Sequence, residues 1–396
     1  MATTSSAPIT VTSARSVEEV EALRDRWQSV PWARVDADVD YYLTVIHARP
    51  EVIRPHAILV ERDGRPVAAL AARLEVVPLA TRVGYQVLYR PRVRSLTTVH
   101  GGLVCRDEAA LGPLCEALDR LLASGEADLV AFPSVRIDTP AYRAVSSMAG
   151  RLRSQHFSET STHHRLVLPA SFDEFLASRS RKVRFGVRYD TRRLLEALGD
   201  RLAVERLDAP AHLERLVGDL ERVAAKTYQR GLGVSFADTP EQWERARLSL
   251  ERGWLRAWVL YLGGVPIAFW QGWLYGGTFS TGTTGYDPAY ARHRVGIYLL
   301  MRVIEDLCAD PQVEVLDFGL GDAAYKRQFG SESWQERDVV VFAPTVRGVR
   351  INLVRTAILA AAVGARRVAG SLGLTERIKR GWRTRVRPGG QSGEAD

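Results

Sequence analysis

The stretch from Trp254 to Asp287, WLRAWVLYLGGVPIAFWQGWLYGGTFSTGTTGYD, decides the fold of this chain. Three runs rich in apolar, aromatic and β-branched residues occur within it, at 257–262, 265–274 and 278–284. Gly263-Gly264 and Gly276-Gly277 separate the runs, and glycine pairs favour tight hairpin turns because glycine adopts positive φ without a steric cost. The stretch therefore predicts three consecutive antiparallel strands.

The flanking residues extend this pattern into a complete α+β unit. Upstream we expect a strand at 203–207 and helices at 211–229 and 242–253. Downstream we expect a helix at 295–308, a strand at 313–319, a short helix at 322–329 and a strand at 338–342. Helices, then antiparallel strands, then a helix and more strands are typical of a mixed sheet covered by helices.

The first half of the chain also mixes helices and strands. Ser16 is a candidate N-cap of a helix at 16–27, with Glu19 three residues later. We further expect a hairpin of strands 57–61 and 66–74, a helix at 111–123 and a strand at 128–132. A strand at 163–169 and a long, Arg-rich helical stretch at 171–199 follow. The arginines form either a solvated helix face or a phosphate-binding or substrate-binding surface between the halves.

Length and composition indicate a two-domain protein of a reducing compartment. A chain of 396 residues is long for one domain. Its cysteines, Cys105, Cys115 and Cys308, are odd in number and lack metal-ligand spacing, so a disulfide framework is not expected. The first ten residues do not resemble a signal peptide, and no apolar run reaches the ~18 residues of a membrane span. We therefore expect a cytoplasmic protein.

The positive charge of the chain belongs to its C-terminal tail. From 346 to 396 there are eleven Arg and Lys and three Asp and Glu, an excess that equals the net charge of +8. The basic residues surround an apolar centre, AILAAAVGA, at 357–365. Basic tails commonly bind phosphates of lipid head groups or nucleic acid. We expect the tail at 346–387 to be an amphipathic helix on an anionic membrane surface; a helix packed on the protein and an RNA contact are the alternatives.

A glycine-bearing loop before the expected helix at 295–308 is the first candidate site. The N-terminus of a helix offers free N–H groups and the positive end of the helix dipole, which suit a pyrophosphate. Gly296 allows close approach of a ligand to the backbone, and basic residues precede it. The alternative is a plain loop. The candidate cofactor-binding residues are Arg292, His293, Arg294, Val295 and Gly296.

The segment LDFGLGDAAYKRQFG, at 316–330, is the second candidate site. Asp317 ends an apolar strand beside a glycine turn, where acid–base groups are often placed. Asp322 is either an acid–base group or the N-cap of the next helix, and Lys326 is either functional or a solvated helix residue. No metal site is expected, because the adjacent His163 and His164 point to opposite faces of a strand.

Four stretches together resemble the CelD-type acetyltransferase family of the GNAT superfamily, which is related to FemAB-like tandem proteins. They are FLASRSRKVRFGVRYDTRRLLEALG at 175–199, RVAAKTYQRGLG at 222–233, GYDPAYARHRVGIYLLMRVIEDL at 285–307 and VLDFGLGDAAYKRQFG at 315–330. The last is the most specific. The superfamily pattern has Gln or Arg, Gly three residues later, and Gly or Ala two residues after that. Counted from His293, Gly296 matches and Tyr298 departs.

The resemblance implies two tandem GNAT-like halves and acyl transfer from acyl-CoA to an amine or hydroxyl. Members of the family tend to occur with cell-surface polysaccharide genes. The family's Asp, Tyr and Lys correspond to Asp317, Asp322, Tyr325 and Lys326. The implied division comprises a disordered 1–12, a degenerate GNAT-like 13–162, a strand and basic connecting helix at 163–201, a catalytic GNAT domain at 202–345 and a basic tail at 346–396.

These features lead to a hypothesis for the reaction. The thioester of acetyl-CoA or another acyl-CoA lies in the splay between the strand 265–274 and its neighbour at 314–318, and a backbone N–H polarises its carbonyl. Asp317 or Asp322 accepts the proton of the acceptor, and Lys326 holds an anionic group. The residues expected to bind substrate are Tyr228, Trp270 and Tyr286. The rivals are an aminoacyl-tRNA-dependent FemAB-like transferase and a non-enzymatic scaffold at the membrane surface.

Overall fold

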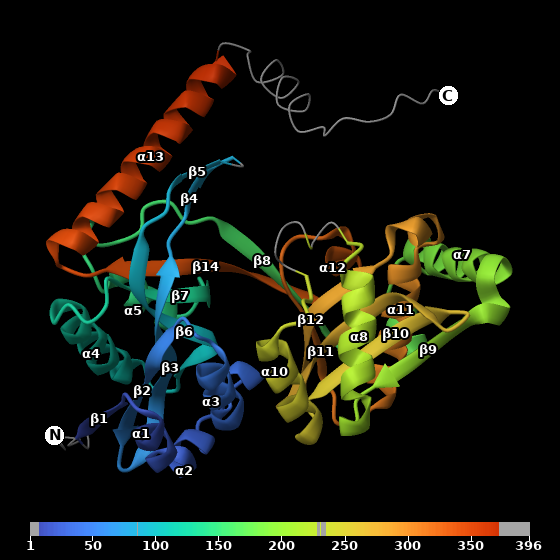
Figure 1. Ribbon diagram of the computed structural model, residues 1–396, viewed down its shortest axis with the longest axis horizontal. Helices are drawn as coiled ribbons and strands as arrows, with labels where there is room; N and C mark the ends of the chain where they lie inside the picture. The colour runs from blue at the N-terminus through green and yellow to red at the C-terminus, as the bar shows by residue number, and fades with distance from the viewer. Residues whose placement is uncertain (1–7, 85, 228–229, 231–234, 372–396) are drawn as a thin grey trace, which may run out of the picture.

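The computed structural model describes residues 8–84, 86–227, 230 and 235–371, in which two mixed halves share one sheet (Figure 1). Over these residues the sheet has twelve strands. Their order is β1-β2-β3-β6-β7-β14-β8-β13-β12-β11-β10-β9. The expected α+β fold of two similar halves with mixed sheets is confirmed by this arrangement.

The first half contributes four antiparallel strands and a fifth, β7, that is parallel to β6. The strands are β1 (Ile9–Ala14), β2 (Val52–Arg62), β3 (Arg65–Pro78), β6 (Arg92–Cys105) and β7 (Leu129–Arg136). A separate two-stranded sheet pairs β4 (Thr81–Val83) with β5 (Gln86–Tyr89). The helices are α1 (Val17–Ala22), α2 (Arg24–Gln28), α3 (Val39–Ala48), α4 (Leu111–Ala123) and α5 (Pro140–Ser147).

The second half repeats the same order of strands. Here β9 to β12 are antiparallel and β13 is parallel to β12. The strands are β9 (Leu202–Leu207), β10 (Leu255–Leu262), β11 (Val265–Tyr275), β12 (Thr278–Tyr286) and β13 (Val315–Leu320). The helices are α6 (Phe172–Ala177), α7 (Arg181–Leu198), α8 (Leu213–Ala224), α10 (Pro240–Glu251), α11 (Val295–Ala309) and α12 (Ala324–Phe329).

Two long strands join the halves. The strand β14 (Glu332–Phe342) follows the second half in sequence but pairs with β7 of the first half and with β8 (Thr160–Val167). The strand β8 in turn pairs with β13 of the second half. Figure 1 shows both strands running between the halves. The sheet is therefore continuous through the connection, and the division into domains at 162, 201 and 345 stays a prediction.

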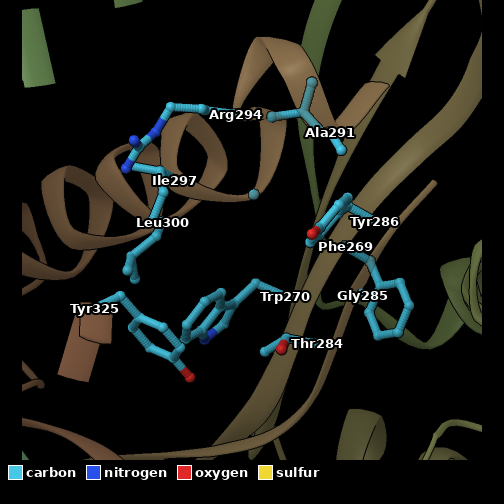
Figure 2. A pocket seen from close by; sticks show the side chains of 12 residues that line it. Phe269, Trp270, Thr284, Gly285, Tyr286, Ala291, Arg294, Ile297, Leu300 and Tyr325 are labelled. Atoms are coloured by element: carbon cyan, nitrogen blue, oxygen red, sulfur yellow. The ribbon is translucent and has the colours of Figure 1, made fainter. Parts of the chain in front are cut away.

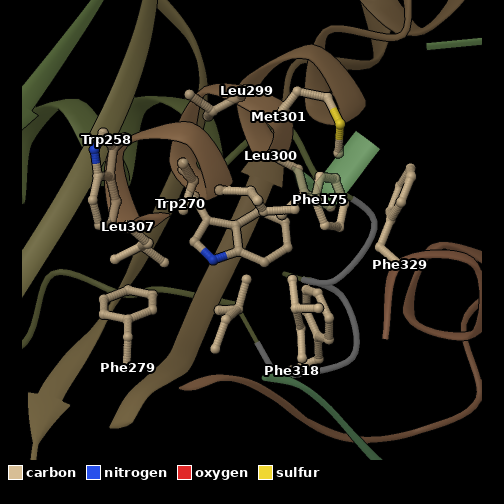
Figure 3. Packing of buried hydrophobic residues seen from close by; sticks show 14 of the residues in the cluster. Phe175, Trp258, Trp270, Phe279, Leu299, Leu300, Met301, Leu307, Phe318 and Phe329 are labelled. Carbon is tan, nitrogen blue, oxygen red and sulfur yellow. The ribbon is translucent and has the colours of Figure 1, made fainter. Parts of the chain in front are cut away.

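The core of the second half lies between the sheet and α11. Leu299, Leu300 and Leu307 on α11 are each at most 1% exposed, and they pack against aromatic residues of the sheet and of α6 (Figure 3). Trp270 of β11 lies in the middle of this cluster. The packing fixes the N-terminus of α11 against β12, which places the candidate cofactor loop.

The helix α13 (Val346–Ser371) starts on the first half and then projects from the body of the molecule (Figure 1). Its first turns are fastened by an ion pair between Arg347 and Asp128, at 3.0 Å, and by Asn352, which donates to two backbone carbonyls. By length and composition the segment Val346–Ala365 is apolar enough to cross a membrane, with a mean hydropathy of 1.3 and 22% of its most apolar window buried, whereas no such segment was expected from the sequence. The first turns therefore pack on the first half. The apolar centre at 357–365 beyond them is exposed or half-buried.

The structure corrects two expectations about the basic stretch at 171–199. It forms two helices instead of one, because Ser180 caps α7 with its side chain after a break at 178–180. It also lies beside α11 on the side of the second half away from the first half (Figure 1), so its arginines do not form a surface between the halves. Val187 and Leu194 are its buried face, in agreement with the spacing in the sequence.

Candidate active site

A splay between two parallel strands opens the sheet of the second half. The ladder between β12 and β13 joins only 278–280 to 315–317, although both strands continue beyond it. The expectation that β13 neighbours the strand 265–274 is wrong, because β12 lies between β11 and β13. Among the residues that the structure describes, the edge of β12 beyond Ser280 therefore has no strand partner on this side, and its backbone groups are available to a ligand.

A cavity of about 300 Å³ lies between β11, β12 and the start of α11 (Figure 2). Trp270 and Tyr325 face it from below in Figure 2, with Ile297 and Leu300 of α11 opposite them. The indole Nε1 of Trp270 is buried, and within the described part of the chain it has no hydrogen-bond partner. A mainly apolar cavity with one unpaired N–H donor suits an acyl chain or a pantetheine arm that carries a carbonyl. We refer to it as the donor cavity.

The start of α11 forms one end of the donor cavity. Arg294 adopts the left-handed conformation, with φ of 54°, and no side chain caps the helix. The N–H groups of Val295 and Gly296, as the first two residues of the helix, have no acceptor within it. A Cβ at Gly296 would lie 3.2 Å from a ring carbon of Tyr286, so glycine keeps this approach open.

The residues around this helix start fit a pyrophosphate. Arg292 is exposed and donates to the ring of His293, and Arg294 pairs with Asp190 of α7 at 2.9 Å. These cations and the free N–H groups are a donor set for phosphate. Tyr298, which departs from the superfamily pattern, packs against the core with Arg302 over its ring, and it does not line the donor cavity.

A second cavity, of about 460 Å³, lies where the two halves meet, and we call it the acceptor cavity. The first half supplies Arg34 and His100, and the second half supplies Asp317 and Lys326. The strands β8 and β14, which join the halves, supply His163 and Glu336. Phe318 lines the acceptor cavity and Tyr325 lines the donor cavity, with ring centroids 5.9 Å apart. The two cavities thus lie on either side of this aromatic pair.

A network of buried charges forms one wall of the acceptor cavity. Asp317 accepts from Arg34 at 2.8 Å through one oxygen, and through the other it accepts from the Gly319 N–H at 2.7 Å and contacts His163 Nε2 at 2.6 Å. On the other side of the ring, His163 Nδ1 lies 2.9 Å from Glu336. Trp334 stacks on His163 with ring centroids 4.4 Å apart. One histidine therefore bridges two carboxylates on three neighbouring strands.

The network shifts the protonation equilibria of its members. Burial lowers the pKa of His163, but the hydrogen bonds and charges of Asp317 and Glu336 outweigh burial and raise the pKa to about 9. Burial raises the pKa of Asp317, but His163, Arg34 and the Gly319 N–H lower it below the usual range. At neutral pH the network thus holds an imidazolium ion between carboxylates.

Lys326 and Asp322 differ in their surroundings. Lys326 is 8% exposed and donates to the carbonyls of Gly319 and Leu320, and burial lowers its pKa. Asp322 is exposed, pairs with Arg327 at 2.6 Å and does not line the acceptor cavity. The alternative that Asp322 caps the next helix is wrong, because α12 begins at Ala324 with Ala323 as its N-cap.

The structure thus gathers most of the predicted site residues into two groups. Trp270, Tyr286, Arg294, Val295, Gly296 and Tyr325 line the donor cavity. Asp317 and Lys326 line the acceptor cavity. Arg292 and His293 end a short 3-10 helix, Pro288–His293, where a loop was expected, and they line neither cavity. Tyr228 lies outside the described residues.

Several polar residues of the acceptor cavity were not predicted, among them Arg34, His100, His163 and Glu336. His163 was considered only as a metal ligand. As expected, it and His164 point to opposite faces of β8, toward Asp317 and Asp322 respectively. The signal that could have identified His100 is the dipeptide Gly101-Gly102 after it, because two glycines inside a strand pattern often mark a bulge.

Comparisons with known proteins agree with this geometry. Residues 181–327 match the family model described as "Acetyltransferase (GNAT) domain". None of the curated proteins matches the chain. Among solved structures, FemX superposes with a TM-score of 0.55 at 12% identity, covering 85% of this chain and 98% of its own.

Two further solved structures are similar to the chain. A conserved protein of unknown function from Bacteroides thetaiotaomicron has a TM-score of 0.50 at 11% identity, covering 84% of this chain and 100% of its own. A tandem GNAT protein from the clavulanic acid biosynthesis pathway has a TM-score of 0.48 at 12% identity, covering 85% of this chain and 99% of its own. At such identities the likeness to solved structures concerns the fold alone.

The matched segment contains both sides of the splay, the start of α11 and most of α12. The second half therefore carries a GNAT acetyltransferase domain, and the chain is an enzyme of the acyltransferase class. GNAT domains use an acyl-CoA as co-substrate, which agrees with the apolar cavity that ends at a helix N-terminus.

Proposed function

We propose that this enzyme transfers an acyl group from acetyl-CoA or another acyl-CoA to an amine or hydroxyl acceptor bound between the halves. The observation that carries the proposal is that the donor and acceptor cavities lie on either side of the contact between Phe318 and Tyr325, beside the splay of β12 and β13. A thioester in one cavity and a nucleophile in the other would be brought together there.

The residues of the donor cavity have separate roles in this proposal. The N–H groups of Val295 and Gly296, with Arg292 and His293 nearby, hold the pyrophosphate. The unpaired edge of β12 supplies a backbone N–H that polarises the thioester carbonyl, as in an oxyanion hole. Trp270 and Tyr286 line the path of the acyl chain.

The residues of the acceptor cavity hold the acceptor and set its charge environment. Lys326 binds an anionic group of the acceptor in this proposal. Its ammonium group lies at the cavity wall, where it also donates to a backbone carbonyl. Asp317 organises this wall, because both of its oxygens are engaged by protein donors. Asp322 lies outside the cavity. Neither aspartate is thus placed to take the acceptor's proton.

Ligand-induced stabilisation separates this proposal from its rivals. Acetyl-CoA should raise the melting temperature of the chain, since a ligand at 100 times its Kd contributes about 2.7 kcal/mol. Stabilisation by aminoacyl-tRNA but not by acetyl-CoA would instead support the FemAB-like alternative. The similarity of the fold to that of FemX is compatible with this alternative. A melting temperature that neither ligand changes would support the scaffold and refute both transferases.

We also propose that the enzyme works in the cytoplasm at the inner face of the membrane, on an acceptor for cell-surface polysaccharide or envelope synthesis. The support is the exposed, apolar continuation of α13 and the eight Arg and Lys residues between 366 and 387. Each basic residue near an anionic bilayer contributes about 1 kcal/mol.

Liposome flotation tests the membrane proposal. The full chain is compared with a chain that ends at Ala365, which keeps the turns of α13 that Arg347 and Asn352 fasten. Only the full chain should float with anionic vesicles, and added salt should release it. Equal flotation of both chains, or none of either, would refute the proposal; retention of RNA by the full chain alone would assign the tail to RNA.

A further inference from the structure

A proton acceptor is missing from the residues placed so far in the acceptor cavity. Acyl transfer to an amine or hydroxyl needs a base with an available lone pair. Asp317, His163 and Glu336 are each at most 8% exposed and bind one another. The ammonium group of Lys326 donates to the carbonyls of Gly319 and Leu320, so it is turned toward the protein backbone. Arginines do not act as bases at neutral pH.

His100 is the one remaining titratable side chain among the described residues that line this cavity. It is exposed to the cavity and lines both the acceptor cavity and an adjoining cavity of about 360 Å³. Within the described chain it forms no hydrogen bond or ion pair with the protein. Both ring nitrogens are therefore available to a ligand.

A large bulge in β6 places His100 at the wall of the acceptor cavity. Leu70 pairs with Leu103 and Ala72 pairs with Thr98, so four residues of β6 lie opposite Ala71 alone. Such bulges redirect side chains and are common next to active sites.

The two glycines after His100 make the bulge feasible. Gly101 has φ of +67°, and its Cβ would lie 2.9 Å from Arg34. A Cβ at Gly102 would lie 2.6 Å from the carbonyl oxygen of Ala71. Neither site accepts a side chain, so this backbone requires Gly101 and Gly102.

We propose that His100, from the first half, is the general base of the acyl transfer performed by the second half. The inference rests on the transferase function proposed above. It also gives the first half, which carries no match to the acetyltransferase model, a chemical role beyond covering the cavity.

The step balances as follows in this assignment. The acceptor nitrogen or oxygen forms a bond to the thioester carbonyl carbon, the C–S bond breaks and CoA leaves as thiolate. The acceptor's proton moves to the imidazole of His100. The imidazolium releases this proton to solvent in the open cavity, and the thiolate takes up a proton from solvent, so that the products are the acylated acceptor and the free thiol of CoA.

The electrostatic surroundings agree with this role. Burial lowers the pKa of His100. Asp36 and Glu336 raise it, and Arg34 and Arg73 lower it, with a net decrease from the ordinary value of 6.5. His100 is therefore neutral at pH 7, as a base must be before it accepts a proton.

The test compares thiol release from acetyl-CoA by the wild-type chain, His100→Gln and His100→Ala. Water alone, ethanolamine and glucosamine serve as probe acceptors. We expect both variants to bind acetyl-CoA like the wild type but to lose about 10²-fold or more in turnover. Imidazole added to His100→Ala should restore part of the rate, and the acidic limb of the wild-type pH profile should be absent from His100→Gln. His156→Gln, an exposed histidine outside both cavities, is the matched control.

The possible results are distinct. Wild-type turnover in His100→Gln, or a loss that imidazole does not restore and that leaves the acidic limb in place, would overturn the assignment of the base. A wild-type chain that neither binds acetyl-CoA nor releases thiol would overturn the transferase proposal itself.

Discussion

The bridging of two carboxylates by His163 predicts how the stability of the chain depends on pH. The folded-state pKa of about 9 lies above the ordinary 6.5 that His163 has in the unfolded chain. Below pH 6.5 the ring is charged in both the folded and the unfolded chain, and the charged ring contributes fully to the unfolding free energy. This contribution is lost as the pH rises through 9. The difference between the two values corresponds to about 3 kcal/mol of unfolding free energy.

Chemical denaturation between pH 6 and pH 9.5 measures this contribution. Tryptophan fluorescence is a suitable signal, because Trp334 stacks on the His163 ring. The wild-type chain should lose about 3 kcal/mol relative to His163→Gln across this range, and His156→Gln should follow the wild type. A difference between wild type and His163→Gln that stays constant with pH would refute the bridging imidazolium.

Three further substitutions test the site. Asp317→Asn should lower the unfolding free energy by about 3–5 kcal/mol in denaturant titrations, because it removes the buried carboxylate that pairs with both Arg34 and His163; a loss below 1 kcal/mol would contradict the network. Asp322→Asn should leave the melting temperature and turnover unchanged, since its carboxylate is exposed and outside the cavities; a large loss of turnover would return it to the catalytic group. Trp270→Phe should weaken acetyl-CoA binding about fivefold in calorimetry, by the loss of one hydrogen bond from Nε1, and an unchanged affinity would show that this N–H does not meet the ligand.

Local signals in the sequence predicted several elements correctly, although the helix expected at 16–27 is divided into α1 and α2, and the strand expected at 338–342 is only the end of β14. The glycine pairs before β11 and β12 have positive φ, as hairpin turns require, and α4 spans the predicted residues 111–123. The start of α11 was also predicted, because a glycine near a helix start is visible in a short window. These features depend on residues close in sequence, so periodicity and turn chemistry suffice to find them.

The acceptor cavity could not be predicted in this way. Arg34 and Asp317 are 283 residues apart, and His163 and Asp317 are 154 apart. Their contact depends on β14 and β8 inserting between the halves, and no short pattern encodes such strand exchange. The N-cap alternative for Asp322 is wrong for a local reason, since the glycine turn is longer than assumed and α12 begins two residues later.

Calorimetric titration of acetyl-CoA into the wild-type chain, Gly296→Ala and Gly296→Asp tests the central claim most directly. An aspartate near the start of α11 favours the helix dipole but repels a pyrophosphate, whereas alanine adds only a methyl group near Tyr286. We expect one binding site in the wild type, weaker binding in Gly296→Ala and none in the folded Gly296→Asp. Equal affinity in wild type and Gly296→Asp, or no binding to the wild-type chain, would contradict the acyl-CoA site at the N-terminus of α11.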